Sequence, residues 1–325
     1  MTERIVVTTR LPGGAIEMIR ADPVGRDAEI VHLDEPTKPD RALLLESVRG
    51  ATGLLPHIPD RIDAEVMDAA GPGLRIIANY GAGYDNIDVA AARERGIMVT
   101  NTPDVLTEAT ADIAWLLVLN AARETLAANR DLRVGSWPGW HPEQYIGKDL
   151  VGRTLLIVGM GRIGTAVARR ATGWGMRILY TARTRKPEAE RPPIGAEWSE
   201  LDDGLARADV VSLHCPLTPE THHLMDATRL GMMKEGAILV NTARGAVIDE
   251  AALVEALDGG RLHAAGLDVF EREPEIHPGL IDHERAVLLP HIGSATEETR
   301  VALTGIAVRN LLCALNGAEP PNRVD

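Results

Sequence analysis

The sequence is poor in cysteine and in long apolar runs, and each shortage excludes a class of protein. Its two cysteines, Cys215 and Cys313, are too few and too far apart for a disulfide framework or a zinc site. We therefore expect a reducing, cytoplasmic location and no metal centre. The most apolar window, residues 113–119, is too short to span a bilayer. The first residues lead directly into an expected strand, so we predict no signal peptide.

Positive charge is also in short supply. The net charge of −13 leaves little basic surface for nucleic acid or anionic lipid. A hydrophobic content of 45% and a charged content of 25% are typical of a globular protein. The 325 residues are enough for two domains, each with its own core. We therefore expect a two-domain protein that binds neither nucleic acid nor a membrane.

The chain is organised around residues 155–164, Leu-Leu-Ile-Val-Gly-Met-Gly-Arg-Ile-Gly. An apolar strand runs directly into the pattern Gly-x-Gly-x-x-Gly, and helical periodicity follows. The first glycine permits a sharp turn, the second lets backbone approach a pyrophosphate, and the third lets helix and strand pack closely. The phosphates would lie on the helix N-terminus. The residues expected to contact a dinucleotide here are Gly159, Gly161, Arg162, Ile163 and Gly164.

The next expected strand, residues 176–180, bears on the choice of dinucleotide. Enzymes that prefer NAD usually carry an acidic residue at its end, which holds the ribose 2′-hydroxyl. Here Arg183, Thr184 and Arg185 follow instead, with no carboxylate before Glu188. Two guanidinium groups and a hydroxyl favour a 2′-phosphate, so we predict that NADP(H) is preferred and that NAD(H) is possible. The alternative interpretation is a solvated basic loop.

Strand and helix signals alternate along the whole chain. Strands are expected at 5–7, 28–33, 53–55, 74–78 and 97–99, and again at 155–158, 177–180, 210–213, 237–240, 264–268 and 286–289. This rhythm predicts an α/β fold with two Rossmann-like, doubly wound parallel-sheet domains. Between them, an Ala- and Leu-rich helix is expected at about 104–129, buried between domains or subunits.

Several motifs together resemble one enzyme family. They are Ala-Asn-Tyr-Gly-Ala-Gly-Tyr-Asp-Asn-Ile-Asp at 78–88, the glycine pattern at 159–164, His-Cys-Pro-Leu-Thr at 214–218, Asn-Thr-Ala-Arg-Gly at 241–245, Leu-Asp-Val-Phe-Glu-Arg-Glu-Pro at 267–274 and Leu-Pro-His-Ile-Gly at 289–293. Over nearly its full length the chain resembles the D-isomer-specific 2-hydroxyacid dehydrogenases. The resemblance implies three catalytic residues, Arg244, Glu273 and His291.

The chemistry of 2-oxo acid reduction accounts for these residue types. Hydride moves from nicotinamide to the carbonyl carbon while a proton goes to the carbonyl oxygen. His291 would donate that proton, because imidazole titrates near neutral pH. Glu273 would hold the other ring nitrogen and favour the charged ring. Arg244 would bind the substrate carboxylate or keto oxygen.

The resemblance implies further site residues. For the substrate, the amides of Ala82 and Gly83 would bind the carboxylate and Leu55 would line the pocket. Trp140 would either reach the neighbouring subunit's site or act as a packing anchor at the subunit interface. The expected cofactor contacts beyond the glycine turn and the basic loop are Thr107, Cys215, Pro216, Thr221, Ala243, Asp268 and Gly293. Asp268 would hold the nicotinamide carboxamide. Cys215, after a buried strand, is interpreted as a packing residue and not a nucleophile.

The resemblance also implies the domain organisation. A substrate-binding domain would comprise 1–102 and 293–325, a dinucleotide-binding domain 103–292, and the active site would lie in the cleft between them. The helix at 104–129 and the segment 137–142 suggest a homodimer. The basic loop and the tryptophan segment resemble glyoxylate/hydroxypyruvate reductases, so a small 2-oxo or 2-hydroxy acid is expected. The alternatives are a dehydrogenase for a bulkier D-2-hydroxy acid or phosphite, or a cofactor-sensing binding protein.

Overall fold

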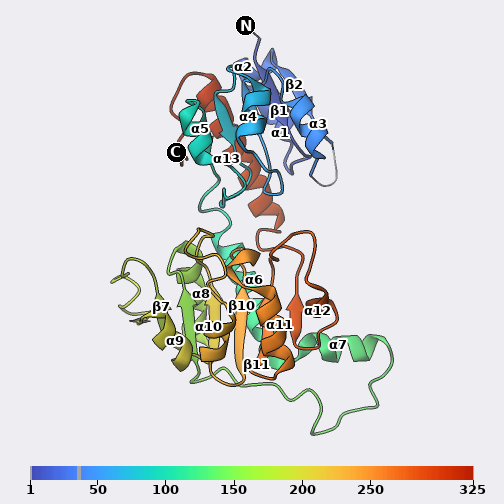
Figure 1. The fold of residues 1–325 in the computed structure, drawn as a ribbon, viewed down its shortest axis with the longest axis vertical. Coiled ribbons are helices and arrows are strands. Elements are labelled where there is room, and N and C mark those ends of the chain that lie inside the picture. The colour runs from blue at the N-terminus through green and yellow to red at the C-terminus, as the bar shows by residue number, and fades with distance from the viewer. Residues whose placement is uncertain (1, 35–37, 325) are drawn as a thin grey trace. The chain divides into compact units, whose positions relative to one another are not determined.

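The computed structural model describes residues 2–34 and 38–324. The chain divides into two compact units, each with its own parallel sheet (Figure 1). Unit 1 consists of Met1–Leu106 and Ala295–Asp325, and unit 2 of Thr107–Ser294. Unit 1 is therefore assembled from two separate stretches of the chain, whereas unit 2 is continuous.

The sheet of unit 1 has five parallel strands in the order β2-β1-β3-β4-β5. They are β1 (Arg4–Val7), β2 (Glu29–His32), β3 (Gly53–Leu55), β4 (Ile76–Ala78) and β5 (Met98–Thr100). Every residue of β3 and β4 is buried. Strands covered on both faces need apolar residues throughout, which is why these two have no polar face. The expected alternation of strands and helices is confirmed here.

Helices cover both faces of this sheet. They are α1 (Ala15–Ala21), α2 (Pro23–Arg26), α3 (Arg41–Ser47), α4 (Ala64–Ala70), α5 (Val89–Glu94) and α13 (Glu297–Leu315). One core lies between the sheet and α3, α4 and α5, and the other between the sheet and α1 and α13. The side chains of Asp40, Asp63 and Asp88 cap the helices that follow them by accepting backbone N–H groups.

The sheet of unit 2 has seven parallel strands in the order β12-β11-β10-β9-β6-β7-β8. They are β6 (Thr154–Val158), β7 (Arg177–Thr181), β8 (Glu197–Trp198), β9 (Val210–Leu213), β10 (Ala237–Asn241), β11 (Leu262–Leu267) and β12 (Ala286–Leu288). The chain reverses its winding direction between β6 and β9. In open sheets of this kind, ligands bind beyond the carboxyl ends of the strands at that reversal.

Two groups of helices cover the two faces of the unit 2 sheet. The helices of this unit are α6 (Thr107–Arg123), α7 (Thr125–Arg133), α8 (Arg162–Gly173), α9 (Leu201–Arg207), α10 (Ala227–Met232), the 3₁₀ turn η1 (Gly245–Val247), α11 (Glu250–Asp258) and α12 (Pro278–Ile281). The α6 and α8 helices form one core with the sheet, and α9 to α12 form the other. The apolar face of α6 is thus buried against the sheet of its own unit.

The single helix expected at 104–129 is wrong in its extent, because the structure contains two helices, α6 and α7. Glu124 separates them with a left-handed backbone, φ 51°, which interrupts the helical hydrogen-bond ladder. The carbonyl of Ala122 accepts a bond from the amide of Lys148 at 2.7 Å. A Cβ on Gly147 would lie 2.2 Å from the same carbonyl oxygen. The crossing of residues 147–148 over the end of α6 therefore accounts for the break.

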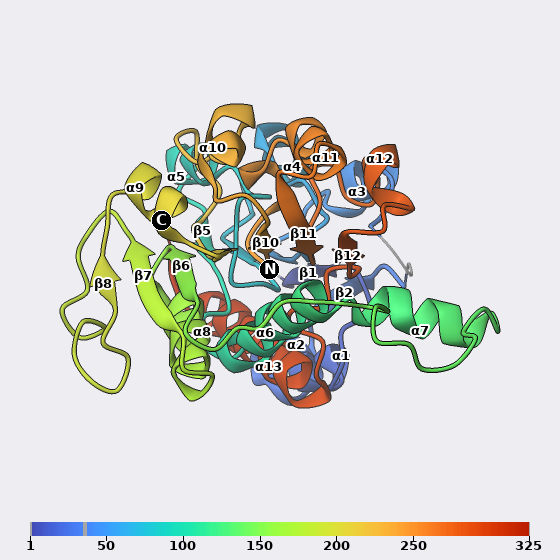
Figure 2. The same ribbon diagram turned by 90° about the horizontal axis from the view of Figure 1, so that it is seen from below.

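Two smaller features also differ from expectation. The edge strand β8 makes a seventh strand where six were expected, because two residues are too few to show a strand pattern. The α7 helix buries no residue and projects from the rest of unit 2 in two perpendicular views (Figures 1 and 2). Among residues 2–34 and 38–324, no helix is both long and apolar enough to cross a membrane.

Candidate active site

The glycine turn joins β6 to α8 at the centre of the unit 2 sheet. Gly159 has a φ of 98°, and a Cβ there would lie 2.7 Å from the backbone of His214 and Cys215. A Cβ on Gly164 would lie 2.2 Å from the carbonyl oxygen of Gly159. Both positions therefore require glycine. A Cβ on Gly161 would meet no atom within 4 Å, so this side of the turn is open.

Gly161 is also the N-cap of α8, and no side chain caps the helix there. The N-cap therefore supplies no side-chain acceptor to the first turn of α8, and the helix dipole favours an anion there. An open approach beside uncapped amides fits the pyrophosphate of a dinucleotide.

The basic loop after β7 contains two arginines in different situations. Arg185 donates two hydrogen bonds to Glu190, both at 3.1 Å, and its guanidinium lies 5.6 Å from the ring centre of Trp198. Glu190 also accepts a bond from the buried Tyr180 hydroxyl at 2.7 Å. Arg183 is exposed and, within the described part of the chain, has no ion-pair partner. Arg183 is therefore better placed than Arg185 to contact a phosphate.

The loop after β10 presents Arg244. Asn241, fully buried at the end of the strand, donates a bond to the carbonyl of Arg244 at 2.8 Å and accepts one from the amide of Ala243 at 2.9 Å. At the next position, a Cβ on Gly245 would lie 1.8 Å from the backbone carbon of Phe270. The absence of a side chain at Gly245 thus lets this loop pack directly on the loop that carries Glu273.

Glu273 and His291 are in direct contact. Nδ1 of His291 lies 2.8 Å from Oε2 of Glu273, and Oε1 of Glu273 accepts a bond from the Phe270 amide at 3.0 Å. The two side chains are 31% and 35% exposed, so the pair is open to a ligand from one side. His291 has a left-handed backbone with φ 53°, a conformation that is uncommon and costly for non-glycine residues.

Asp268 holds the segment after His291. This buried residue follows β11, and its two carboxylate oxygens accept bonds from the amides of Ile292 and Gly293, both at 2.7 Å. Burial raises the pKa of Asp268 above its ordinary value, although the two amides and His291 act in the opposite direction. The carboxamide contact expected of Asp268 stays a prediction; in the structure both of its carboxylate oxygens bind backbone amides.

The charges of the three expected catalytic residues interact. Burial alone would raise the pKa of Glu273, but the hydrogen bond and charge of His291, the Phe270 amide and the charge of Arg244 together hold it below its ordinary value. Glu273 is therefore ionised at neutral pH, and its carboxylate holds Nδ1 of His291. Arg244, Glu273 and His291 thus form one cluster in unit 2.

Other expected cofactor residues lie at the same edge of the sheet. Cys215, Pro216 and Thr221 follow β9, and Gly293 follows β12, while Thr107 is the first residue of α6. Burial raises the pKa of Cys215 to about 11, so the thiol stays protonated at neutral pH. That state suits a packing residue and not a nucleophile.

The expected carboxylate-binding loop belongs to unit 1. It follows β4, and Leu55 lies on the neighbouring strand β3, 1% exposed. The carbonyls of Gly81, Ala82 and Gly83 each accept a bond within the unit. In the part of the chain described, the amides of Ala82 and Gly83 donate to no protein acceptor. Successive backbone amides without a protein acceptor are a common way for proteins to bind anions.

Trp140 lies in the extended segment that follows α7, and its side chain is 84% exposed. Apolar side chains from Leu126, Leu132, Val134 and Trp137 are exposed in the same region. This contiguous stretch, residues 126–140, is called the arm below. Its exposed apolar residues are unusual for an isolated surface.

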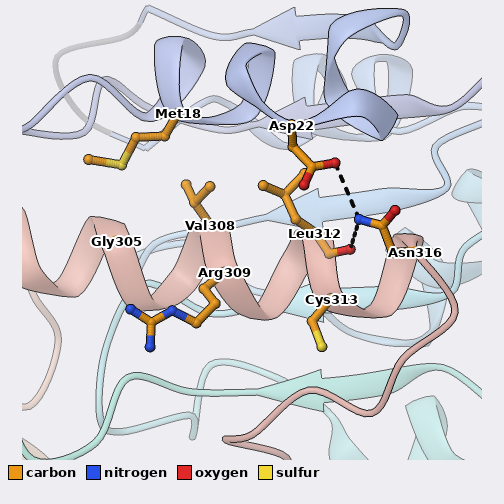
Figure 3. A pocket seen from close by; sticks show the side chains of 8 residues that line it. All are labelled: Met18, Asp22, Gly305, Val308, Arg309, Leu312, Cys313 and Asn316. Carbon is orange, nitrogen blue, oxygen red and sulfur yellow. Dashed lines mark hydrogen bonds between the residues drawn. The ribbon is translucent and has the colours of Figure 1, made fainter.

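A separate groove of about 360 Å³ lies between α1 and α13 in unit 1 (Figure 3). Met18, Val308 and Leu312 line it together with polar groups, and Asn316 donates a bond to Asp22 at 3.2 Å. It contains none of the expected site residues. Among residues 2–34 and 38–324, no cluster of His, Cys, Asp and Glu side chains is arranged to hold a metal.

Comparison with known proteins agrees with this arrangement. Residues 115–293 match the family model described as D-isomer specific 2-hydroxyacid dehydrogenase, NAD binding domain. The glyoxylate reductases of Thermococcus onnurineus and Pyrococcus furiosus are 48% and 46% identical to this chain, over all of it and 96% of their own lengths. The chain belongs to the D-isomer-specific 2-hydroxyacid dehydrogenase family. It is an oxidoreductase of that family, and glyoxylate reductases are among its relatives.

Solved structures agree with this relationship over the full length. A glyoxylate reductase from Paecilomyes thermophila is 36% identical, with a TM-score of 0.88 over 99% of this chain and 98% of that one. An NADPH-dependent glyoxylate/hydroxypyruvate reductase from Sinorhizobium meliloti, in complex with NADP and malonate, is 36% identical. Its TM-score is 0.87 over 100% of this chain and 97% of that one.

Some residues that shape the site were not predicted from the sequence. Asn241 holds the Arg244 loop, and Glu250 accepts a bond from the Glu271 amide at 2.9 Å beside the Glu273 loop. An asparagine directly after an apolar strand was a usable signal for Asn241, because a buried amide there needs backbone partners. Glu250 lies at a helix start, where acidic residues are common, and the sequence offered no signal for it.

Proposed function

We propose that the protein reduces glyoxylate or hydroxypyruvate to the corresponding 2-hydroxy acid and prefers NADPH. The observation that carries this proposal is the 2.8 Å contact between His291 and Glu273 beside the Arg244 loop. The cluster lies at the sheet edge that also presents the open glycine turn. The glyoxylate reductases among the relatives favour a small 2-oxo acid over a bulkier one.

His291 supplies the proton in the proposed reaction. Because its Nδ1 contacts the Glu273 carboxylate, Nε2 is the nitrogen that faces the substrate oxygen. The charged ring donates its Nε2 proton to that oxygen during reduction and accepts it back during oxidation. The bound nicotinamide supplies the hydride. Arg244 stabilises the negative charge that develops on the oxygen.

The free amides of Ala82 and Gly83 are proposed to bind the substrate carboxylate. Hydrogen bonds from amides to a charged group contribute about 1.5–3 kcal/mol each, which is enough to select acids over neutral carbonyl compounds. Leu55 is proposed to limit the pocket to small side chains. The same set would act on glyoxylate and on hydroxypyruvate.

NADP(H) is the proposed cofactor, and Arg183 is its proposed determinant. Arg183 is exposed, and its charge contributes to the low pKa of Glu220, which is caused mainly by the Thr218 hydrogen bond. Its guanidinium therefore lies toward the loop after β9. Arg185 is paired with Glu190, so its proposed role is to shape the loop, with Thr184 beside it. The solved relative with bound NADP supports this proposal.

The test is steady-state oxidation of NADPH and NADH with glyoxylate and hydroxypyruvate as acceptors. We expect Arg183→Ala to raise the KM for NADPH by about tenfold or more, since one charge-assisted bond is lost, and to leave NADH kinetics unchanged. Arg185→Ala, the matched variant, should have a smaller effect on NADPH. Preference of the parent protein for NADH would contradict the cofactor proposal. No turnover with either acceptor would contradict the substrate proposal.

A homodimer is also proposed, with the arm as its contact surface. The arm exposes several large apolar side chains and buries no residue of α7. We propose that a second copy of this chain covers the arm. In a two-fold symmetric contact the same surface is used on both copies, so the exposed apolar residues of both arms are buried together. Trp140 is proposed to enter the neighbouring subunit's site in that assembly.

A further inference from the structure

The carboxylate-binding loop of unit 1 is held through its carbonyl groups. The Gly81 carbonyl accepts a bond from the Thr102 amide at 3.0 Å. The Ala82 carbonyl accepts one from the side-chain amide of Asn101 at 2.7 Å, and the Gly83 carbonyl one from Asn79 at 2.8 Å. Three successive carbonyls are therefore directed toward donors of the unit itself.

This arrangement determines where the amide groups point. A trans peptide is planar, so each N–H points opposite to the carbonyl of the preceding residue. The bond from Thr102 orients the Ala82 amide, and the bond from Asn101 orients the Gly83 amide. By the same geometry, Asn79 orients the amide of Tyr84. Like the other two, the Tyr84 amide has no acceptor in the described part of the chain.

The two asparagines are themselves held in one orientation. Asn86 donates a bond to the side-chain oxygen of Asn79 at 3.2 Å, which turns the NH₂ group of Asn79 toward Gly83. Asn79 is fully buried. The backbone of Asn101 accepts a bond from Asn310 of α13 at 3.0 Å and donates one to Asn322 at 3.2 Å. Neither side chain is free to turn away from the loop.

We propose that Asn79 and Asn101 are positioning residues for carboxylate recognition, a role that rests on the proposed function because it presumes a 2-oxo acid at this loop. Through Asn101 the Gly83 amide is aimed at the carboxylate, and through Asn79 the Tyr84 amide becomes a third donor. Neither asparagine touches the substrate. Orienting donors before binding lowers the cost of forming the complex.

The test compares Asn101→Ala and Asn79→Ala with the parent protein. We expect the KM for glyoxylate to rise by about tenfold to a hundredfold, since each disoriented amide weakens a bond to a charged group. The value of kcat and the affinity for NADPH should not change, because the bond is equally present in the ground and transition states. Calorimetric titration of the protein–NADP⁺ complex with oxalate should show the same loss without any turnover.

Asn316→Ala is the matched control, because its side-chain amide caps α13 and contacts only Asp22 and Leu312. Its KM and oxalate affinity should equal those of the parent. Parent-like oxalate affinity in Asn101→Ala, or equal losses in kcat and NADPH binding, would overturn the positioning role.

Should the parent reduce neither glyoxylate nor hydroxypyruvate, the proposed function fails, and oxalate titration alone then decides the role of the asparagines. Asn101 is only half-buried, so we expect Asn101→Ala to fold. It can therefore test the proposal by itself if Asn79→Ala does not fold.

Discussion

At the scale of single residues, the candidate site depends on a few backbone positions that hold reactive side chains in unusual conformations. His291 has a left-handed backbone, and the Asp268 carboxylate binds the two amides that follow it. Such a conformation costs about 1–3 kcal/mol and persists only when neighbouring contacts compensate. Asp268 supplies such contacts to the backbone that follows His291, and Glu273 supplies one to the imidazole.

Glu273→Gln tests the ion pair at this scale. The amide holds Nδ1 of His291 less strongly than a carboxylate does, so kcat/KM for reduction at neutral pH should fall by about a hundredfold. Oxidation, which needs the neutral ring, should lose less. In the parent protein, the pKa of Glu273 lies below its ordinary value, so the carboxylate is charged at neutral pH.

Glu271→Gln serves as the matched control, because Glu271 contacts His223 and not His291. It should leave kcat/KM near the parent value in both reaction directions. Equal losses in the two reaction directions for Glu273→Gln would contradict a role in holding the charged ring.

The sequence predicted the catalytic residue types but not the contacts that support them. Gly245 and His291 belong to motifs, so their importance was evident from the resemblance. The need for glycine at 245 depends on the Phe270 backbone, which is distant in the sequence. The partner of Arg185, Glu190, was also not predicted, because an ion pair within a loop depends on how the loop folds. Long-range contacts of this kind have no local pattern.

At the scale of elements, the amino edge of the unit 2 sheet is held by one carboxylate. Asp209 precedes β9, accepts a bond from the Thr154 amide of β6 at 2.8 Å and pairs with Lys234 at 3.2 Å. Burial would raise its pKa, but the Thr154 amide, Lys234 and Arg153 hold it below the ordinary value. The charged form of Asp209 therefore stabilises the folded sheet.

Asp209→Asn should reduce stability by about 1–3 kcal/mol at pH 7, since bonds to a charged acceptor are weakened. The pKa of Asp209 is lower in the folded state than in the unfolded state. Its stabilisation is therefore fully present above about pH 4, the ordinary pKa of an aspartate, and is lost as the pH falls through the folded-state pKa. The difference between parent and variant in urea midpoint should therefore be the same at pH 7 and pH 5, and smaller at pH 3. Asp202→Asn, which removes an exposed pair with Arg229, should change stability little at any of these pH values.

The elements that the sequence predicted well are those buried on two faces. Strands such as β6 and β9 are buried along their whole length and mostly apolar, and they were located within one residue. The break at Glu124 was missed because both sides of it have helical composition. The cause is a contact with residues 147–148, which local periodicity does not reveal.

At the scale of the whole molecule, the proposed homodimer accounts for the exposed apolar arm. Analytical ultracentrifugation should give twice the mass of one chain at micromolar concentration. Leu132→Glu places a charge on the arm and should shift the protein toward monomer, because burying an unpaired charge is costly. Met232→Glu, at an exposed apolar position on α10, is the matched control and should stay dimeric. A monomeric parent protein would contradict the proposal.

The discontinuous make-up of unit 1 has a consequence for biosynthesis. One of its two cores contains Ala307, Leu311 and Leu315 of α13 together with Ile5 and Leu55 of the first strands. A ribosome completes residues 107–294 before it synthesises α13, so unit 2 has all its strands while unit 1 still lacks a covering helix. Domains fold as units during synthesis at about 5–20 residues per second. The core that α13 completes is therefore the last to close, and in the nascent chain α1 covers that face of the unit 1 sheet without α13 for the intervening seconds.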